Sequence, residues 1–163
     1  MTLPRLLILA SLASLASTQA GLAGQDGRTY SQTPPPAVDT APPSAIRLFA
    51  GVEEAWGAPD IDRLASLLDT TAVRISIKPG VPLTSALTRV AAAFLLKDQL
   101  SLVRTEEFRL TRFDCDKKRD VCRAIAIWTG DWGGRQGRRA VRVTLTARGR
   151  AKRWLLTEIR AED

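Results

Sequence analysis

The chain contains no histidine, two cysteines and a single tyrosine in 163 residues. Zinc sites are built from several cysteine and histidine side chains, so two cysteines alone are too few to form one. The sequence also has no glycine-rich phosphate loop, no dinucleotide-binding glycine pattern and no nucleophile elbow. We therefore expect no metal and no cofactor.

Long hydrophobic runs are missing after the first 23 residues, which have the layout of a secretory signal peptide. Arg5 lies beside the amino terminus, residues 6–16 are apolar, and Ala20 and Ala23 are candidate cleavage positions. The apolar run is shorter than the ~20 residues that span a bilayer, and no nearby cysteine could carry a lipid anchor. We expect residues 1–23 to be a cleaved signal peptide and the protein to be exported, periplasmic or secreted. An uncleaved amphipathic leader is the alternative.

Residues 24–44 are polar and rich in proline, with proline runs at 34–36 and 42–43. Such a sequence has no apolar face to bury, so we expect a disordered, extended linker. A proline-rich recognition motif is the alternative. One folded domain is expected over residues 45–163, which is long enough to bury an ordinary core.

Apolar residues at helical spacing predict three helices after the linker. Ile46 to Trp56 form the first, and a second follows with Asp60 as its N-cap. The third is expected to begin at Thr84 or Ser85. Its predicted core-facing stripe is Leu87, Val90, Ala91, Phe94 and Leu95.

Period-two alternation predicts one strand over residues 72–78 and four more between Arg104 and Asp163. The short polar breaks between the last four indicate consecutive antiparallel hairpins. Cys115 and Cys122 flank the first of these breaks, and in an oxidising compartment we expect them to form a disulfide worth ~2–3 kcal/mol. A pair of free buried thiols is the alternative.

The element order of two helices, a strand, a helix and four strands resembles the nuclear transport factor 2-like superfamily, the α+β cone also found in ketosteroid isomerase and SnoaL-like proteins. The matching segments are DIDRLASLLDTTAVRISI, TSALTRVAAAFLLKDQ and the four-strand meander, over Ala45–Glu162. The chain is most similar to small exported bacterial members of unassigned function. The resemblance implies a curved antiparallel meander sheet with three helices on its concave face and a pocket between the third helix and the sheet. The predicted pocket lining is Phe94, Leu95, Phe108, Leu110 and Ile127.

Pairing Cys115 with Cys122 fixes a register for the first hairpin, because opposed residues keep a constant sum of numbers. The predicted pairs are Asp114 with Arg123, Leu110 with Ile127, and Phe108 with Thr129. In the last hairpin they are Leu145 with Leu155, Val141 with Ile159, and Arg142 with Glu158. The helix-facing core is then Phe108, Leu110, Ile125, Ile127, Val141, Val143, Leu145, Leu155 and Ile159.

The same register predicts an unusually apolar opposite face, where Arg109 faces Trp128. This face would present Phe113, Ala124, Ala126, Trp128, Ala140, Thr144, Trp154 and Leu156. Solvated sheet faces are usually more polar, so we expect a homodimer through this face, centred on Phe113, Trp128, Trp154 and Leu156. The alternative is a β-bulge, which reverses which residues face the core and places a tryptophan inside.

Positive charge is concentrated in the second half of the chain, where Arg104–Asp163 holds 16 basic and 9 acidic residues. The first and third loops of a meander emerge at the same end of the sheet. We expect their basic residues to bind an anionic envelope component or an acidic protein: Lys117, Lys118, Arg119, Arg148, Arg150, Lys152 and Arg153. The absence of aromatic residues within these loops argues against nucleic acid. The alternative is that the loops confer only solubility and discourage edge pairing.

Catalysis is disfavoured, because none of the predicted pocket positions carries a carboxylate. Asp69 and Asp98 are the nearest acidic residues, and we interpret both as helix-end or surface residues. Glu53 and Glu54 fit a solvated helix face. The sequence therefore favours a non-catalytic binding module, and a small isomerase- or dehydratase-type enzyme with an unrecognised acid–base residue is the alternative.

Overall fold

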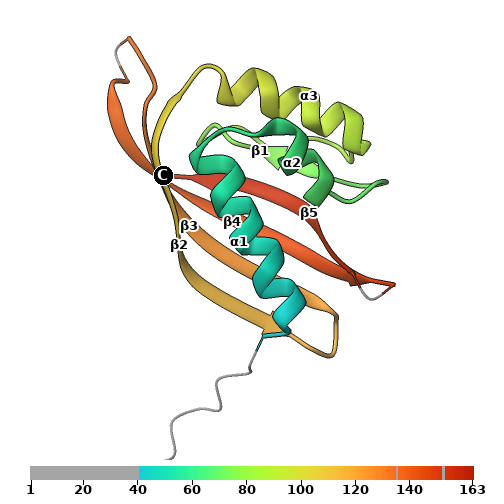
Figure 1. The fold of residues 1–163 in the computed structure, drawn as a ribbon. Coiled ribbons are helices and arrows are strands. Elements are labelled where there is room, and N and C mark those ends of the chain that lie inside the picture. Colours follow the sequence, from blue (N-terminus) through green and yellow to red (C-terminus); the bar gives the residue numbers. More distant parts are fainter. Residues whose placement is uncertain (1–40, 135, 152) are drawn as a thin grey trace, which may run out of the picture. The chain divides into compact units, whose positions relative to one another are not determined.

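The computed structural model describes residues 41–134, 136–151 and 153–163, so the predicted signal peptide and most of the predicted linker lie outside the described residues. Three helices and five strands follow in the predicted order (Figure 1). Their bounds are α1 (Pro43–Gly57), α2 (Ile61–Leu67), β1 (Arg74–Ser76), α3 (Arg89–Leu100), β2 (Arg104–Asp116), β3 (Val121–Asp131), β4 (Arg138–Arg150) and β5 (Arg153–Glu162). The predicted α+β class is confirmed.

One sheet contains all five strands in the order β1-β5-β4-β3-β2. Strands β2 to β5 form the predicted antiparallel meander, whereas β1 pairs in parallel with β5, with Ile75 opposite Ile159. The other edge of β1 is covered by the chain that follows it. There Val73 and Leu87 exchange two backbone hydrogen bonds of 2.9 and 2.8 Å, and the Thr84 hydroxyl accepts one from the Ile75 N–H at 3.1 Å.

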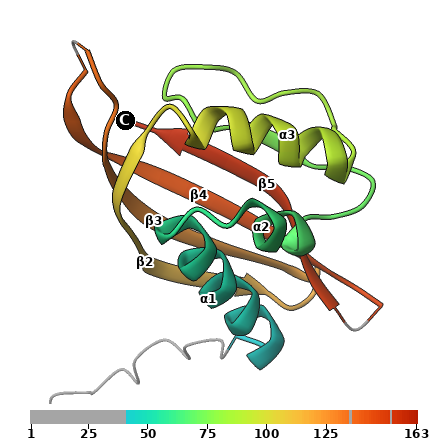
Figure 2. The ribbon, with the colours of Figure 1, turned by 45° about the horizontal axis from the view of Figure 1, so that its top comes forward.

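The helix that crosses the sheet is α1, and α3 lies along the edge formed by β1 and β5 (Figure 2). Helix α1 buries Phe49, Val52 and Trp56 against the sheet, on what we call the inner face. The predicted stripe of α3 is wrong, because its buried residues are Ala92, Leu96 and Leu100. Residues 84–87 cover β1 instead of starting the helix, which begins later with Thr88 as its N-cap.

The first hairpin is closed by the predicted disulfide between Cys115 and Cys122, and Asp114 faces Arg123 as predicted. Beyond that point the register shifts by one at a β-bulge between Leu110 and Arg112. Leu110 therefore faces Ala126 and Phe108 faces Trp128, so the pairs predicted with Ile127 and Thr129 are wrong. Because of the bulge, the apolar residues on both sides of it in β2 face the same side of the sheet.

The bulge also reverses the predicted faces of β3. Trp128 is fully buried on the inner face, where its indole ring lies 5.3 Å from that of Trp56, and its Nε1–H donates to the Thr105 hydroxyl at 3.1 Å. Phe113 also faces inward and packs edge-on against Phe49 at 5.1 Å. The inner positions of β3 are Cys122, Ala124, Ala126 and Trp128, while Ile125 and Ile127 lie on the opposite, open face.

The last hairpin has a different register from the predicted one. Arg150 pairs with Arg153, Leu145 with Ile159 and Arg142 with Glu162, and a shift follows Thr146. The predicted partners Leu155, Ile159 and Glu158 for Leu145, Val141 and Arg142 are wrong, because the hairpin closes at Arg150 and Arg153 and the register shifts again after Thr146. Leu156 is buried on the inner face and Leu155 lies on the open face. Five of the predicted core residues are confirmed as buried: Phe108, Val141, Val143, Leu145 and Ile159.

Candidate functional site

Aromatic rings fill the space between α1 and the inner face, whereas the predicted pocket was placed between the third helix and the sheet. Trp56 stacks on Phe108 with ring centroids 4.6 Å apart, and Trp128 contacts the edge of this pair. The predicted pocket residues do not come together, because Phe94 on α3 is 64% exposed and Ile127 lies on the open face. Of the others, Phe108 is buried in this cluster, whereas Leu95 and Leu110 are half-buried. The part of the inner face that α1 covers is therefore a packed core.

The residues predicted to contact a second copy lie mainly inside the domain. Trp128 and Leu156 are fully buried, and Phe113 packs against Phe49. Trp154 is half-buried and faces Gly149 across the last hairpin. The predicted composition of the dimer face is therefore wrong, because the bulge in β2 and the register shift between Thr146 and Ala147 change which residues of β3 and β5 face the core.

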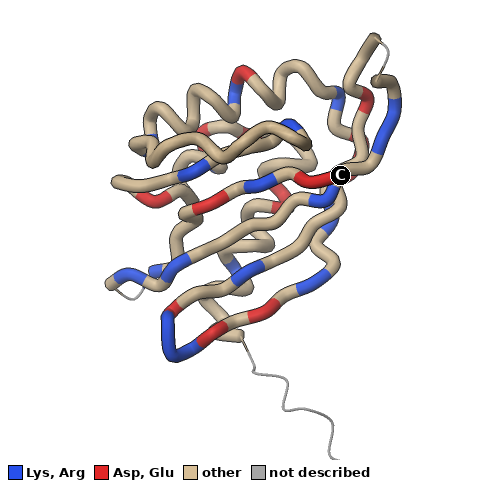
Figure 3. The backbone as a smooth tube through the Cα atoms, turned by 180° about the vertical axis from the view of Figure 1, so that it is seen from behind, with Lys and Arg blue, Asp and Glu red and all other residues tan. Residues whose placement is uncertain are grey.

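The open face of the sheet is polar and is arranged in rows across the strands. One row runs through all five strands and consists of Asp114, Arg123, Thr146, Glu158 and Arg74. Its members are neighbours because they occupy the same register position on adjacent strands, ~4.8 Å apart. Figure 3 shows the side of the molecule opposite to Figure 1, where basic and acidic positions are interspersed along the strands. The row places charges of alternating sign, with a hydroxyl between them, on one line.

Around this row lies a hollow of about 760 Å³, which we call the basic groove. Six arginines line it: Arg74, Arg119, Arg123, Arg148, Arg150 and Arg160. Four carboxylates and three threonines also line it: Asp114, Asp116, Glu158, Glu162, Thr144, Thr146 and Thr157. No aromatic side chain belongs to this lining. The groove can therefore recognise a ligand by charge and hydrogen bonds, but not by ring stacking.

Three of the predicted anion-binding residues, Arg119, Arg148 and Arg150, lie in this groove. Lys117, Lys118 and Arg153 lie at the same end of the sheet outside its lining, and Lys152 lies outside the described residues. Sequence reasoning did not assign Arg74, Arg123 and Arg160 to an anion-binding site, because it considered only the basic residues of the loops. The place of these three arginines on the open face could have been predicted from the alternation of apolar and polar residues, because each lies between two residues that face the core.

Four of the six groove arginines have a carboxylate partner. Arg74 pairs with Glu158, Arg160 with Glu162 at 3.2 Å, Arg119 with Asp116 at 3.6 Å and Arg150 with Asp69 at 3.1 Å. The other two, Arg123 and Arg148, have no carboxylate within 4.0 Å among the residues that the structure describes. They lie on adjacent strands β3 and β4 and are exposed. These two guanidinium groups are the parts of the groove that are open to an external anion.

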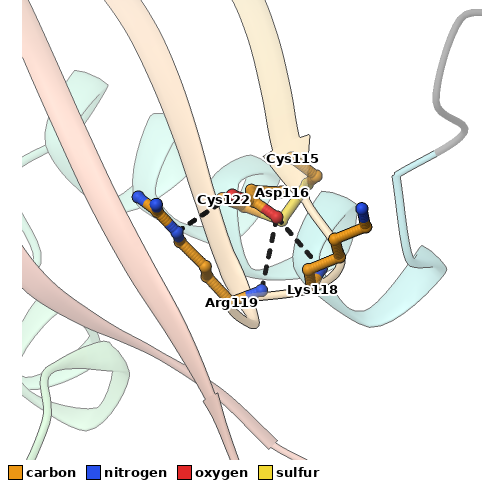
Figure 4. The surroundings of a disulfide bond; sticks show 5 residues. All are labelled: Cys115, Asp116, Lys118, Arg119 and Cys122. Atoms are coloured by element: carbon orange, nitrogen blue, oxygen red, sulfur yellow. Dashed lines mark hydrogen bonds and ion pairs between the residues drawn. A yellow bond between two sulfur atoms is a disulfide. The ribbon is translucent and has the colours of Figure 1, made fainter.

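The two hairpins at this end of the sheet are held together by local contacts. The Asp116 carboxylate accepts hydrogen bonds from the backbone N–H groups of Lys118 at 3.0 Å and Arg119 at 3.3 Å, beside the disulfide (Figure 4). The Gly149 N–H donates to the Asp120 carbonyl at 2.9 Å, which joins the β4–β5 hairpin to the β2–β3 hairpin. These contacts fix the loops that carry Arg119 and Arg150.

Asp69, one of the two candidate acids, is 1% exposed and follows α2. Its Oδ1 accepts hydrogen bonds from the backbone N–H and the hydroxyl of Thr71 at 2.9 and 3.0 Å, and its Oδ2 lies 3.1 Å from Arg150 Nε. Burial by itself raises the pKa of Asp69, but the Thr71 hydrogen bonds and the Arg150 charge outweigh it and hold the pKa below its ordinary value. Asp69 is thus an ionised anchor for a groove arginine. The other candidate, Asp98, is exposed on α3.

A smaller hollow of about 280 Å³ lies between α2 and α3. Phe94 and Val90 line it and are 64% and 65% exposed, and Ile61 lies on its other side. Within the described residues, no group of acidic and cysteine side chains could hold a metal ion. No helix in that part of the chain is long and apolar enough to cross a membrane.

No protein-family model and no curated protein matches this chain. Among solved structures, a DUF4783 family protein from Bacteroides ovatus has a TM-score of 0.58 and 14% identity, covering 70% of this chain and 93% of that chain. A DUF4783 family protein from Bacteroides fragilis has a TM-score of 0.56 and 22% identity, covering 69% and 95%. A candidate dehydratase of the NTF2-like family from Streptomyces avermitilis has a TM-score of 0.53 and 16% identity, covering 73% and 93%. At these identities the likeness shows the fold alone.

Proposed function

Since the chain has the nuclear transport factor 2-like fold, we propose that it is an exported binding module that holds an anionic partner in the basic groove. The observation that carries this proposal is the pair Arg123 and Arg148, which lie unpaired among the described residues in a hollow of about 760 Å³. A guanidinium group presents several N–H donors in a planar fork that fits carboxylate and phosphate groups.

The charge of the groove supports an anionic partner. Its lining holds six arginines and four carboxylates, and no lysine or aromatic residue. A concave surface of net positive charge attracts anions more strongly than an exposed patch, because the surrounding protein reduces screening by water. The Cys115–Cys122 disulfide agrees with an exported location, since such bonds persist in oxidising compartments.

The enzyme alternative has less support. Asp69 is the buried carboxylate of the described residues, and its lowered pKa keeps it ionised at neutral pH. A general acid or base acts best when its pKa lies near the working pH, so this shift has the wrong direction. Asp69 is also engaged by Thr71 and Arg150. Its geometry suits a structural role.

The proposal is tested by comparing two pairs of substitutions with the same change in charge. Arg123→Gln with Arg148→Gln removes the two unpaired groove arginines. The control, Arg112→Gln with Arg142→Gln, removes two exposed arginines of the open face that do not line the groove. Binding is measured at low salt to four probes: polyphosphate, dextran sulfate, polygalacturonate and anionic phospholipid vesicles. We expect the groove variant to lose about tenfold or more in affinity for whichever probe binds, and the control to lose little. Equal losses in both variants, or no binding to any probe, would reject the groove as an anion site.

The predicted homodimer is a separate proposal and now rests on different residues. Two half-buried apolar side chains lie side by side on one strand of the open face, Ile125 and Ile127 on β3. A second copy packed over these residues would lie beside the groove and partly cover it. The dimer and the anionic partner should therefore compete for the open face.

A further inference from the structure

We propose that the groove binds an acidic polysaccharide, a polymer that carries both carboxylate groups and free hydroxyl groups. This inference rests on the proposed function and narrows it to one class of ligand. It comes from the composition of the row that crosses all five strands, Asp114, Arg123, Thr146, Glu158 and Arg74.

The row offers donors and acceptors in alternation. Arg123 and Arg74 can only donate hydrogen bonds, the carboxylates of Asp114 and Glu158 can only accept them, and the Thr146 hydroxyl can do both. Arg74 and Glu158 already pair with each other, whereas Asp114 and Arg123 have no ion-pair partner among the described residues. A ligand must therefore supply an anionic group to Arg123 and a hydrogen-bond donor to Asp114, on neighbouring positions of the same row.

An acidic polysaccharide supplies both groups. Its carboxylate matches the fork of a guanidinium, and its hydroxyl groups donate to aspartate and threonine oxygens. Polyphosphate and sulfated polymers that lack free hydroxyls have no hydrogen-bond donor for Asp114 at neutral pH. A nucleic acid strand gains much of its affinity from stacking on aromatic side chains, which this lining does not contain.

The dimensions of the row also suit an extended chain. Neighbouring strands lie ~4.8 Å apart, so the four intervals between β2 and β1 span roughly 19 Å. A polymer lying across the strands can contact Asp114 at one end and Arg74 at the other. Arg148 lies two residues beyond Thr146 along β4, on the same face of the sheet, and can hold a second carboxylate.

The experiment compares polygalacturonate, polyphosphate and neutral dextran on the full chain and on two single variants. We expect polygalacturonate to bind more tightly than polyphosphate despite its lower charge density, and dextran not to bind. Arg123→Gln should weaken polygalacturonate binding about tenfold. Asp114→Asn should also weaken polygalacturonate binding but strengthen polyphosphate binding, because it removes one negative charge from the groove. Circular dichroism spectra of both variants should match that of the starting protein.

Each outcome distinguishes this inference from the proposed function. If the affinity of the polymers follows charge density alone, the groove is a general anion site and the polysaccharide inference is wrong. If Asp114→Asn strengthens binding of both charged polymers, Asp114 makes no hydrogen bond to a sugar and the inference also fails. If dextran binds as tightly as polygalacturonate, the carboxylates of the polymer do not contribute to binding and the inference is wrong. If neither charged polymer binds, the polysaccharide inference is wrong, and the proposed function is then decided by the binding of dextran sulfate and anionic vesicles.

Discussion

The Glu53 carboxylate on α1 accepts a hydrogen bond of 2.9 Å from the backbone N–H of Leu110 on β2, across 57 residues of sequence. Leu110 lies at the β-bulge, where the ladder between β2 and β3 changes register. A bulge leaves backbone groups without their usual partner in the ladder, and Glu53 provides one from the helix. The interpretation of Glu53 as part of a solvated helix face is therefore wrong. This contact ties α1 to the place that decides which residues of β2 face the core.

Replacing Glu53 should destabilise the domain more than replacing its neighbour. Glu53→Ala leaves a partly buried N–H without an acceptor, which costs about 1–2 kcal/mol. Glu53→Gln should retain most of the stability, because its side-chain carbonyl can still accept the hydrogen bond. Glu54→Ala is the control: Glu54 pairs with Arg63 at the exposed surface, where such pairs are worth about 0.5 kcal/mol. Urea denaturation gives the free energies of unfolding, and equal losses for Glu53→Ala and Glu54→Ala would contradict the structural role of Glu53.

The stabilisation provided by Asp69 should depend on pH. Its pKa is lower in the folded protein than the ordinary value of 3.8, because Thr71 and Arg150 together outweigh the effect of burial. A carboxylate with a depressed folded-state pKa stabilises the fold above its unfolded-state pKa, and this contribution is lost as the pH falls through the folded-state value. The difference in unfolding free energy between the starting protein and Asp69→Asn should therefore be constant above about pH 5 and shrink below about pH 4. The exposed Asp98→Asn is the matched control, and a difference that grows on acidification would refute the assignment.

The disulfide should contribute stability that a reducing agent removes. Cys115→Ser with Cys122→Ser is expected to cost about 2–3 kcal/mol, since the bond closes a short loop. Reduction of the starting protein should lower its unfolding free energy by a similar amount. The double variant provides the control, because dithiothreitol should leave its stability unchanged. A further loss on reduction of the double variant would show that the reagent acts elsewhere.

The predicted homodimer can be tested at the open face. We expect Ile127→Glu to yield a monomer in sedimentation velocity while the starting protein sediments as a dimer, because a buried unpaired carboxylate disfavours the contact. Saturation with polygalacturonate should also shift the starting protein towards monomer if the polymer and the second copy compete. A starting protein that is already monomeric at micromolar concentration would end the dimer proposal without affecting the groove.

The element order and the ends of several elements could be predicted because they depend on local patterns. Asp60 caps α2, with its carboxylate accepting from the Arg63 N–H at 3.0 Å, as its place before an apolar stripe predicts. The disulfide could be predicted because the two cysteines flank one hairpin loop. Which residues face the core was harder to predict, because one extra residue in a strand moves the residues beyond it to the opposite face of the sheet. The signal was present in β2, where apolar residues at 108 and 110 are out of step with those at 113 and 115.

The groove could be predicted only in part because its residues meet through register. Arg119, Arg148 and Arg150 lie in loops or at strand ends that any meander brings together. Arg74 joins them only because β1 pairs in parallel with β5 at Glu158, a partner more than 80 positions later in the chain. No periodicity within a single strand contains that information. The buried face of α3 was predicted wrongly for a related reason. Residues 84–87 cover the edge of β1, which is a tertiary contact, so the helix begins later than its local pattern indicates.

The parallel pairing of β1 with β5 has a consequence for how the domain is made. Residues 74–76 emerge from the ribosome long before residues 158–160, so β1 has no partner in the sheet until nearly the whole domain has been synthesised. Contacts so distant in sequence slow folding, because a large loop must close before they form. A chain that folds late stays extended for longer, which is the state in which a polypeptide can be threaded through a narrow membrane pore.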